Sequence, residues 1–467
     1  MRPPAANERH RHQMKSDKNN PKEIFAWKMY DWANSAFYTT VVGALFGPYL
    51  TDVTQRAVGE NGIVMPLGPF GSITAKSFFP TCVSIAVFLQ VFILPIMGAV
   101  ADYSHLKKRM MALACYLAVA ATCLLYFVNG RLYLLGGLLF IIANLGFGAS
   151  NVLYNSFLGE IATEDQRDKV SSRGFAYGYL GGGLLLGLNF LLVNSAARFG
   201  MGTAMAVRLS LLSAGVWWGA FAVITFAALK TRQPAKALPP GKTYLTIGFS
   251  ELGRTFRELS RLRHTLRYLI GYLFYNDGIQ TVISMASVFI AQELFKERGI
   301  ETDQSFLLLI FLLVQFVAIF GALLFERLAY LINTKNAILV SLVIWSGIVV
   351  YGYGFLQTTR QAWVMASVIA IVLGGSQALS RSLFSQMIPR GREASFFGIY
   401  EVSERGTSWL GPFVFGAVVA ATNSYRHALL SLVIFFVVGT VILYFTNTAK
   451  AIHESGNLLP QEAAKES

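Results

Sequence analysis

The sequence predicts an all-α integral membrane protein whose twelve transmembrane helices form two pseudo-symmetric six-helix bundles. Three observations support this prediction. The first is composition, because 54% of the 467 residues are hydrophobic, only 14% are charged and the mean hydropathy is +0.50. A soluble globular protein is less apolar than this. The second is that apolar runs of about 20 residues, enough to cross a bilayer core, recur along the chain. The third is that polar motifs of the first half recur in the second half.

A scan at that length gives the candidate spans and the domain limits. The spans are 27–50, 79–101, 109–128, 132–157, 174–197, 208–229, 267–292, 305–327, 335–356, 361–387, 395–420 and 426–447. The expected domains are an N-terminal tail (1–26), an N-terminal bundle (27–229), a linker with an amphipathic helix (230–266), a C-terminal bundle (267–447) and a C-terminal tail (448–467). A six-plus-six repeat is an architecture of membrane carriers, with the substrate site between the halves.

The distribution of basic residues predicts the orientation. The net charge is +14, and the Lys and Arg residues cluster in short segments between apolar runs, as in 107–109 and 230–266. Since basic residues gather in cytoplasmic loops, we expect both termini and the linker on the cytoplasmic side of the cell membrane. This pattern argues against nucleic acid as a partner. The first residues are polar and basic with no apolar run, so no cleavable signal peptide is expected.

The residue patterns that would indicate a nucleotide, a cofactor or a metal are missing from the sequence. Gly241 to Thr243 resembles the end of a phosphate-binding loop, but Lys236 stands where the first glycine belongs and no strand is expected before it. The three cysteines lie in apolar runs without metal-ligand or redox spacing: Cys82, Cys115 and Cys123. We therefore expect no cofactor and no ATP-driven pumping.

Two polar stripes predict the walls of a cavity. The first span carries polar residues at positions i, i+3, i+4 and i+7, which share one face of a helix: Asp31, Asn34, Ser35 and Tyr38. The seventh span repeats this spacing at one constant offset: Asp277, Gln280, Thr281 and Ser284. A carboxylate at the centre of a membrane helix costs roughly 2.5 to 3.5 kcal/mol on insertion scales. We therefore expect the two stripes to face each other across a polar cavity that forms the substrate or proton pathway.

A second internal match adds residues to this pathway. Ser150 to Leu153 in the fourth span resembles Ser376 to Leu379 in the tenth, which places Asn155 opposite Arg381. The residues added to the pathway are Asn151, Asn155 and Gln377.

A cluster of charges in the eleventh span predicts a second network. Glu401, Glu404 and Arg405 lie at helical spacing, so Glu401 and Arg405 can pair along the helix. Arg381 should lie at a similar depth, and buried charges require partners, so we expect Arg381 to pair with Glu401 or Glu404. Such a network is either a gate or proton relay, or a static structural element; the sequence leaves both open.

Gly98 and Asp102 end the second span and precede a basic cluster that ends at Arg109. This stretch resembles the cytoplasmic loop signature of the major facilitator superfamily, G-x-x-x-D followed by basic residues. It departs from the signature at Tyr103 and His105. The glycine permits close packing, and the acid can face a helix N-terminus. The gating network is expected to include Asp102, Arg109 and Arg173.

The first stripe lies within the stretch D-W-A-N-S-A-F-Y-T-T, which starts at Asp31. Together with Tyr275 to Thr281, it resembles the vacuole effluxer branch of the same superfamily, typified by fungal autophagy-related exporters of amino acids. The resemblance covers both halves and implies the major facilitator fold, and it also implies amino-acid efflux.

The leading functional hypothesis is a secondary-active transporter that moves a small polar solute by alternating access between the two halves. The alternative is a transporter-like nutrient sensor that binds the solute without translocating it. A membrane enzyme is not expected, because the six histidines lie mostly in tails and loops. Asp31 and Asp277 either exchange protons or attract the amino group of a zwitterion. The expected partners are the solute, protons and the lipid bilayer, and the expected assembly is a monomer.

Overall fold

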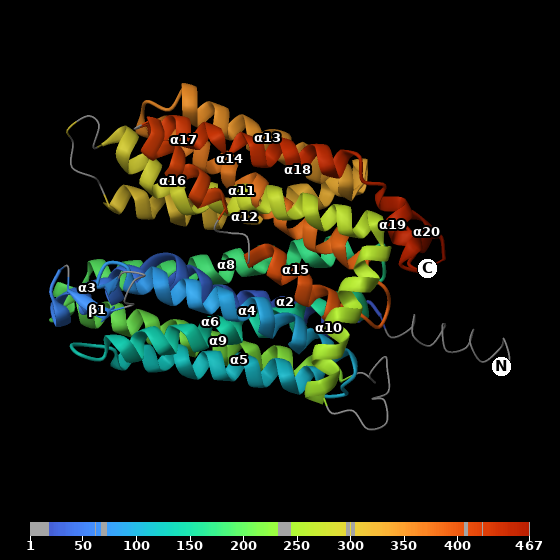
Figure 1. Ribbon diagram of the computed structural model, residues 1–467, viewed down its shortest axis with the longest axis horizontal. Coiled ribbons are helices and arrows are strands. Elements are labelled where there is room, and N and C mark those ends of the chain that lie inside the picture. Colours follow the sequence, from blue (N-terminus) through green and yellow to red (C-terminus); the bar gives the residue numbers. More distant parts are fainter. Residues whose placement is uncertain are drawn as a thin grey trace.

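The computed structural model describes residues 18–60, 62–66, 72–231, 244–295, 299, 304–405, 410–422 and 424–466. These residues form two helical bundles that lie side by side with their helices along one common direction (Figure 1). A small antiparallel sheet of β1 (Ile63–Pro66) and β2 (Ser72–Thr74) pairs Ile63 with Thr74 and Pro66 with Ser72.

Each bundle is built from one half of the chain. The N-terminal bundle contains α2 (Pro21–Ala36), η1 (Phe37–Leu45), α3 (Phe46–Val58), α4 (Phe78–Asp102), α5 (Lys107–Leu124), η3 (Leu125–Phe127), α6 (Tyr133–Ser156), α7 (Leu158–Ile161), α8 (Arg167–Asn194), η4 (Ala196–Phe199) and α9 (Thr203–Ala228). The C-terminal bundle contains α11 (Arg263–Leu294), α12 (Gln304–Ile332), α13 (Thr334–Gly354), α14 (Thr359–Gln386), α15 (Glu393–Arg405), α16 (Leu410–Thr422), α17 (Tyr425–Ser431) and α18 (Val433–Tyr444).

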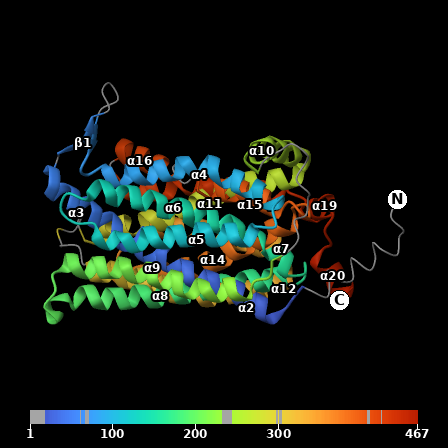
Figure 2. The same ribbon diagram turned by 90° about the horizontal axis from the view of Figure 1, so that it is seen from below.

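The two ends of the molecule differ. The helices α10 (Tyr244–Arg261), α19 (Thr448–Glu454) and α20 (Pro460–Glu466) lie at one end, which we call the terminal end. The sheet of β1 and β2 lies at the other, which we call the opposite end (Figure 2). Helix α4 therefore runs from the opposite end at Phe78 to the terminal end at Asp102.

Nine helices within the described residues are long and apolar enough to cross a membrane. The predicted spans 27–50, 267–292 and 395–420 are outside this set. The first is divided among α2, η1 and α3, and the third between α15 and α16, with residues 406–409 outside the described part. The second is the single helix α11, whose apolar character is lowered by polar residues near its centre. These three are the spans in which polar side chains interrupt the apolar pattern, and all three contribute to the cavity described below.

Each bundle has its own apolar core. Trp218 and Phe140 are fully buried in the N-terminal bundle, and Trp345 stacks on Phe436 in the C-terminal bundle with ring centroids 5.7 Å apart. The outward side chains of both bundles are largely apolar and exposed, as a bilayer-facing surface requires. Burial within each half therefore holds six helices together, while polar side chains concentrate where the halves meet.

The predicted amphipathic helix of the linker is α10, which packs against α4 at the terminal end. Buried Arg392 donates to Thr255 Oγ1 at 2.5 Å and to Glu258 Oε2 at 2.6 Å, which ties α10 to the start of α15. The proline-rich part of the linker, 232–243, is outside the described residues.

Candidate functional site

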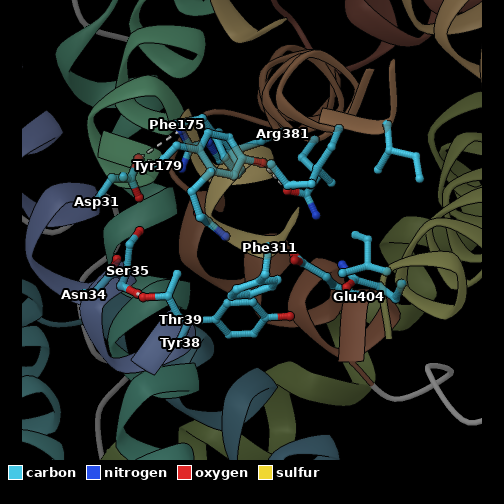
Figure 3. Close-up of a pocket in the computed structure, with 18 of the residues that line it drawn as sticks. Asp31, Asn34, Ser35, Tyr38, Thr39, Phe175, Tyr179, Phe311, Arg381 and Glu404 are labelled. Atoms are coloured by element: carbon cyan, nitrogen blue, oxygen red, sulfur yellow. Dashed lines mark hydrogen bonds and ion pairs between the residues drawn. The ribbon is translucent and has the colours of Figure 1, made fainter. Parts of the chain in front are cut away.

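A cavity of about 280 Å³ lies between the two bundles and is lined from both sides. Figure 3 shows Asp31, Asn34 and Ser35 on one side and Glu404 on the other. Helices α2, η1, α6 and α8 supply the N-terminal wall, and α11, α12, α14 and α15 supply the C-terminal wall. The predicted residues that line it are Asp31, Asn34, Ser35, Tyr38, Asn151, Asn155, Gln280, Gln377, Arg381, Glu401 and Glu404.

An ion pair between the bundles forms part of the lining of this cavity. The guanidinium of Arg381, on α14, places Nη1 and Nη2 each 3.3 Å from Oδ2 of Asp31, on α2. The two side chains are only 4% and 13% exposed. Tyr154 donates to the same Asp31 oxygen at 2.7 Å. Arg381 Nε donates to the hydroxyl of Ser171, on α8, at 2.9 Å, and Arg381 Nη2 donates to the backbone carbonyl of Ser171 at 3.0 Å. Every donor group of the guanidinium is therefore satisfied by the N-terminal bundle, as a buried charge requires.

Aromatic rings surround the guanidinium of Arg381. Its central carbon lies 4.2 Å from the ring centroid of Phe175 and 4.9 Å from that of Trp27. Cation–π contacts of this kind stabilise a cation that has left water. Gly174 provides the necessary space, because a Cβ there would approach Asp31 Oδ2 to 2.6 Å and Arg381 Nη2 to 3.1 Å.

The predicted partner of Arg381 was wrong. The described ion pair of Arg381 is with Asp31, and Glu401 joins through an amide. Arg381 Nη1 is 3.3 Å from Asn155 Oδ1, and Asn155 Nδ2 donates to Glu401 Oε1 at 2.7 Å. Asp31, a carboxylate of the facing bundle, therefore contacts Arg381 directly, whereas Glu401 of its own bundle is reached through Asn155. The side chain of Arg405 is outside the described residues, so its predicted pair with Glu401 is not described.

The predicted position of Asp277 was also wrong. Asp277 is buried, does not line the cavity, and accepts the backbone N–H of Gly411 at 2.9 Å. Gly411 is in the first turn of α16, where free N–H groups and the helix dipole attract a carboxylate. Thr281 and Ser284 also turn away and bond to carbonyls of their own helix, so Gln280 alone represents the second stripe in the lining.

Adjacent side chains on α11 hold the facing ends of α15 and α16. Asn276 Nδ2 donates to the carbonyl of Glu404, in the last turn of α15, at 3.2 Å. Asp277 accepts from Gly411 as described above. A donor thus meets the carbonyl end of one helix and an acceptor meets the amide end of the next, which matches the partial charges of helix termini. The carboxylate of Asp277 consequently serves packing within its own bundle.

Other polar contacts complete the cavity wall. Asn34 Nδ2 donates to Asn151 Oδ1 at 2.8 Å within the N-terminal bundle. Tyr179, on α8, donates to Gln377 Oε1 of the other bundle at 3.0 Å. The cavity therefore carries polar groups on both walls, and Arg381 is the cation among the described residues that line it.

At the terminal end, Asp102 joins the two bundles. Its Oδ1 accepts the backbone N–H of Ala394 at 3.0 Å and its Oδ2 that of Ser395 at 2.9 Å, with the Ser395 hydroxyl as a further donor. These groups are the N-terminus of α15, so the acid faces a helix N-terminus as its position suggested. Gly98 allows the approach, because a Cβ there would be 2.1 Å from the Ala394 carbonyl oxygen.

Further contacts between the bundles lie at the terminal end. They are Arg167 Nη1 to the Ser385 carbonyl (2.7 Å), Thr334 Oγ1 to Asp168 Oδ2 (2.6 Å), Arg390 to Glu164 (2.9 Å) and Arg173 to Glu326 (3.4 Å). Arg173 is 46% exposed, so its pair contributes little. Arg109 is exposed on α5 and forms no ion pair within the described part of the chain, which contradicts its predicted place in the network.

Comparison with known proteins identifies the family. Residues 19–456 match the family model described as vacuole effluxer Atg22 like. The chain belongs to the Atg22-like vacuole effluxer family. It is 30% identical to the uncharacterized MFS-type transporter YxiO of Bacillus subtilis (strain 168), over 94% of this chain and 98% of that protein. It is 25% identical to autophagy-related protein 22 of Kluyveromyces lactis, over 94% and 96% of the two chains.

Among solved structures, the effluxer-family chain is similar to the proton:xylose symporter XylE, with a TM-score of 0.66 at 12% identity over 95% of this chain and 98% of that one. This similarity shows the fold, and it confirms the prediction of the major facilitator fold with two six-helix bundles. The chain is an MFS-type membrane transporter and not an enzyme.

Several residues that complete the effluxer-family site were not predicted from the sequence: Trp27, Tyr154, Ser171 and Phe175. The ring of Trp27 lies against Arg381, and its Nε1 donates to the Tyr154 carbonyl at 3.0 Å. One signal was available for Tyr154, which stands directly before Asn155 on a helix already assigned to the pathway.

The surroundings of Lys18 should make the stability of the protein depend on pH. Its Nζ donates to the Gly159 carbonyl at 2.7 Å, and burial, with nearby Arg167, lowers the pKa of Lys18 from 10.5 to about 8. The folded state therefore releases this proton at lower pH than the unfolded state. The free energy of unfolding should rise between pH 8 and 10.5, by at most about 3 kcal/mol. Thermal unfolding measured at a series of pH values should show that the Lys18→Met variant lacks this rise in stability. A pH profile of stability that matches the wild type would contradict the prediction.

Proposed function

We propose that this effluxer-family transporter is a secondary-active carrier that exports a small zwitterionic solute, an amino acid, by alternating access of its two bundles. The observation that supports this most is the buried Asp31–Arg381 ion pair between the bundles at the cavity. A zwitterion carries the same two charges. Its carboxylate can replace Asp31 as the partner of Arg381, and its amino group can pair with the released Asp31. The family description supports efflux as the direction.

In this proposal the terminal end is cytoplasmic, and the structure represents the state in which that end is closed. The polar contacts of Asp102, Arg167 and Asp168 join the bundles there. The cavity extends from Asp31 toward the opposite end, where Leu307 and Met365, near the starts of α12 and α14, also line it. The solute would leave the cavity through that end.

Proton coupling follows from the same pair. A proton taken up by Asp31 neutralises the carboxylate and removes its attraction for Arg381. Solute and proton would then act on one contact, which is what coupling requires. Asn155 connects Arg381 to Glu401 on α15, so breaking the Asp31–Arg381 pair would also change the contacts of α15. The start of the same helix is held by Asp102 at the terminal end.

Flux through proteoliposomes tests the proposal. Asp31→Asn keeps size and hydrogen bonding but removes the charge, so we expect at least about a tenfold loss of amino-acid flux, or loss of its pH dependence, in protein that is less stable but still folded. Asp277→Asn is the matched control, because this equivalent acid lies outside the cavity lining and its replacement should change flux far less.

Two results would contradict the proposal. Unchanged flux and pH dependence in Asp31→Asn would remove the ion pair from the mechanism. Saturable binding of an amino acid to the wild-type protein, without any flux, would identify the chain as a sensor that binds without translocating.

A further inference from the structure

A groove of about 490 Å³ lies between α11 and α18, where α11 begins and α18 ends. It is separate from the central cavity and no step of the proposed transport uses it. Its walls are formed by Arg263, Leu266, Arg267 and Ile270 of α11 and by Val441, Ile442 and Phe445 of α18 and its end.

Two glycines explain why a groove forms there. A Cβ at Gly271 would lie 3.1 Å from Ile442 Cγ2, and a Cβ at Gly439 would lie 2.7 Å from Tyr275 Cβ. The helices therefore touch closely at this level. Toward the terminal end, larger side chains line the space between them, among them Arg267 and Phe445.

The part of the groove at the start of α11 is cationic. Arg263 and Arg267 are four residues apart and share one face of α11, and both are exposed. Arg267 Nη1 donates to the Phe445 carbonyl at 3.3 Å, which leaves its other donors available. Neither arginine forms an ion pair with a carboxylate in the described ranges, whereas Arg392 nearby in the same bundle contacts two.

The part of the groove farther from the terminal end is apolar, and its side chains are exposed as those of a bilayer-facing surface are. Ile270 is 43% exposed and Val441 49%, and they lie about one helical turn farther from the terminal end than Arg267 and Phe445 do. A free phosphate would leave this wall uncovered, and an uncharged acyl chain would leave the arginines without a counter-charge. A ligand that combines a phosphate with an acyl chain satisfies both parts.

We propose that the groove between α11 and α18 binds one anionic glycerophospholipid, whose phosphate is held by Arg263 and Arg267 and whose acyl chain lies along Ile270 and Val441. Guanidinium groups bind phosphate oxygens in pairs, and basic pockets between membrane helices near the surface hold anionic headgroups. The close contact at Gly271 ends the groove on its inner side, which limits it to a single lipid.

The test uses purified full-length protein in a neutral detergent. Dioleoyl phosphatidylglycerol is titrated, and bound lipid is counted by native mass spectrometry while thermal unfolding is followed. We expect one tightly bound lipid and an increase in unfolding temperature. Removing each arginine should weaken binding about fivefold, and Arg263→Gln with Arg267→Gln together should abolish the thermal shift. Arg257→Gln is the control, since Arg257 is exposed on α10 but does not line the groove.

Each alternative outcome overturns the proposal. An equal shift with inorganic phosphate would show a site for free anions. An equal shift with dioleoyl phosphatidylcholine would show a groove that accepts any lipid. Equal weakening by Arg257→Gln would show general attraction to a basic surface, and an unchanged shift in the double variant would place the lipid elsewhere.

Discussion

Replacing Arg381 with alanine is expected to destabilise the protein by about 3 to 5 kcal/mol, the range for breaking a buried ion pair. The reason is that Asp31 is left as a buried carboxylate whose remaining side-chain donor is Tyr154. The guanidinium also fills the space between Phe175 and Trp27, so its loss leaves these rings without their cation. Solute flux should disappear with it, because the pair is the proposed contact for the zwitterion.

A double-mutant cycle separates the pair from the two single effects. Asp31→Asn in the Arg381→Ala background should restore part of the lost stability, since no uncompensated charge then remains. Arg173→Ala is the control, because the half-exposed Arg173–Glu326 pair also joins the bundles but should contribute less than about 1 kcal/mol. Strict additivity of the Asp31 and Arg381 losses would show that the two charges do not act as a pair.

Replacing Gly98 with valine is expected to prevent closure of the terminal end. The new Cβ would be 2.1 Å from the Ala394 carbonyl oxygen and 2.7 Å from its carbon, and backbone atoms cannot move aside as a flexible side chain can. The start of α15 must therefore move away from α4, and Asp102 loses its contacts with the N–H groups of Ala394 and Ser395. We expect loss of flux and a shift toward the state open at the terminal end.

Cysteine accessibility measures this shift. Ser385→Cys is nearly isosteric, and residue 385 is buried between the bundles at the terminal end. A maleimide applied from the terminal side should label it faster in the Gly98→Val background than in the wild type. Gly253→Val is the control, because Gly253 lies on α10 at the same end with open space around it. Equal labelling in all three proteins would show that Gly98 does not control closure.

The sequence predicted the fold because twelve apolar segments and their repeated polar motifs are local patterns. The stripe of Asp31, Asn34 and Ser35 was predictable for the same reason, since helical periodicity places these residues on one face whatever surrounds them. The equivalence of Asn155 and Arg381 in the two halves was also readable from the internal repeat. In the structure these two equivalent residues contact each other between the bundles.

Partners that come from another helix were not readable. The pairing of Arg381 with Asp31 rather than Glu401 depends on how α2 and α14 are placed when the bundles meet, and no sequence period encodes that. Asp277 shows the limit of the repeat itself. It occupies the position equivalent to Asp31, but the first turn of α16 offers it the N–H group of Gly411. Equal spacing therefore did not give an equal environment.

Distances at both ends of the molecule test the central claim, that the two bundles alternate about the cavity. Spin labels at Arg109 and Tyr330, both exposed near the terminal end, report one distance between the bundles; labels at Arg131 and Arg360, exposed at the opposite end, report another. Pulsed electron paramagnetic resonance should show that Gly98→Val lengthens the terminal distance and shortens the opposite one together. Lengthening at the terminal end with an unchanged opposite distance would contradict alternating access and reduce the effect to local loosening.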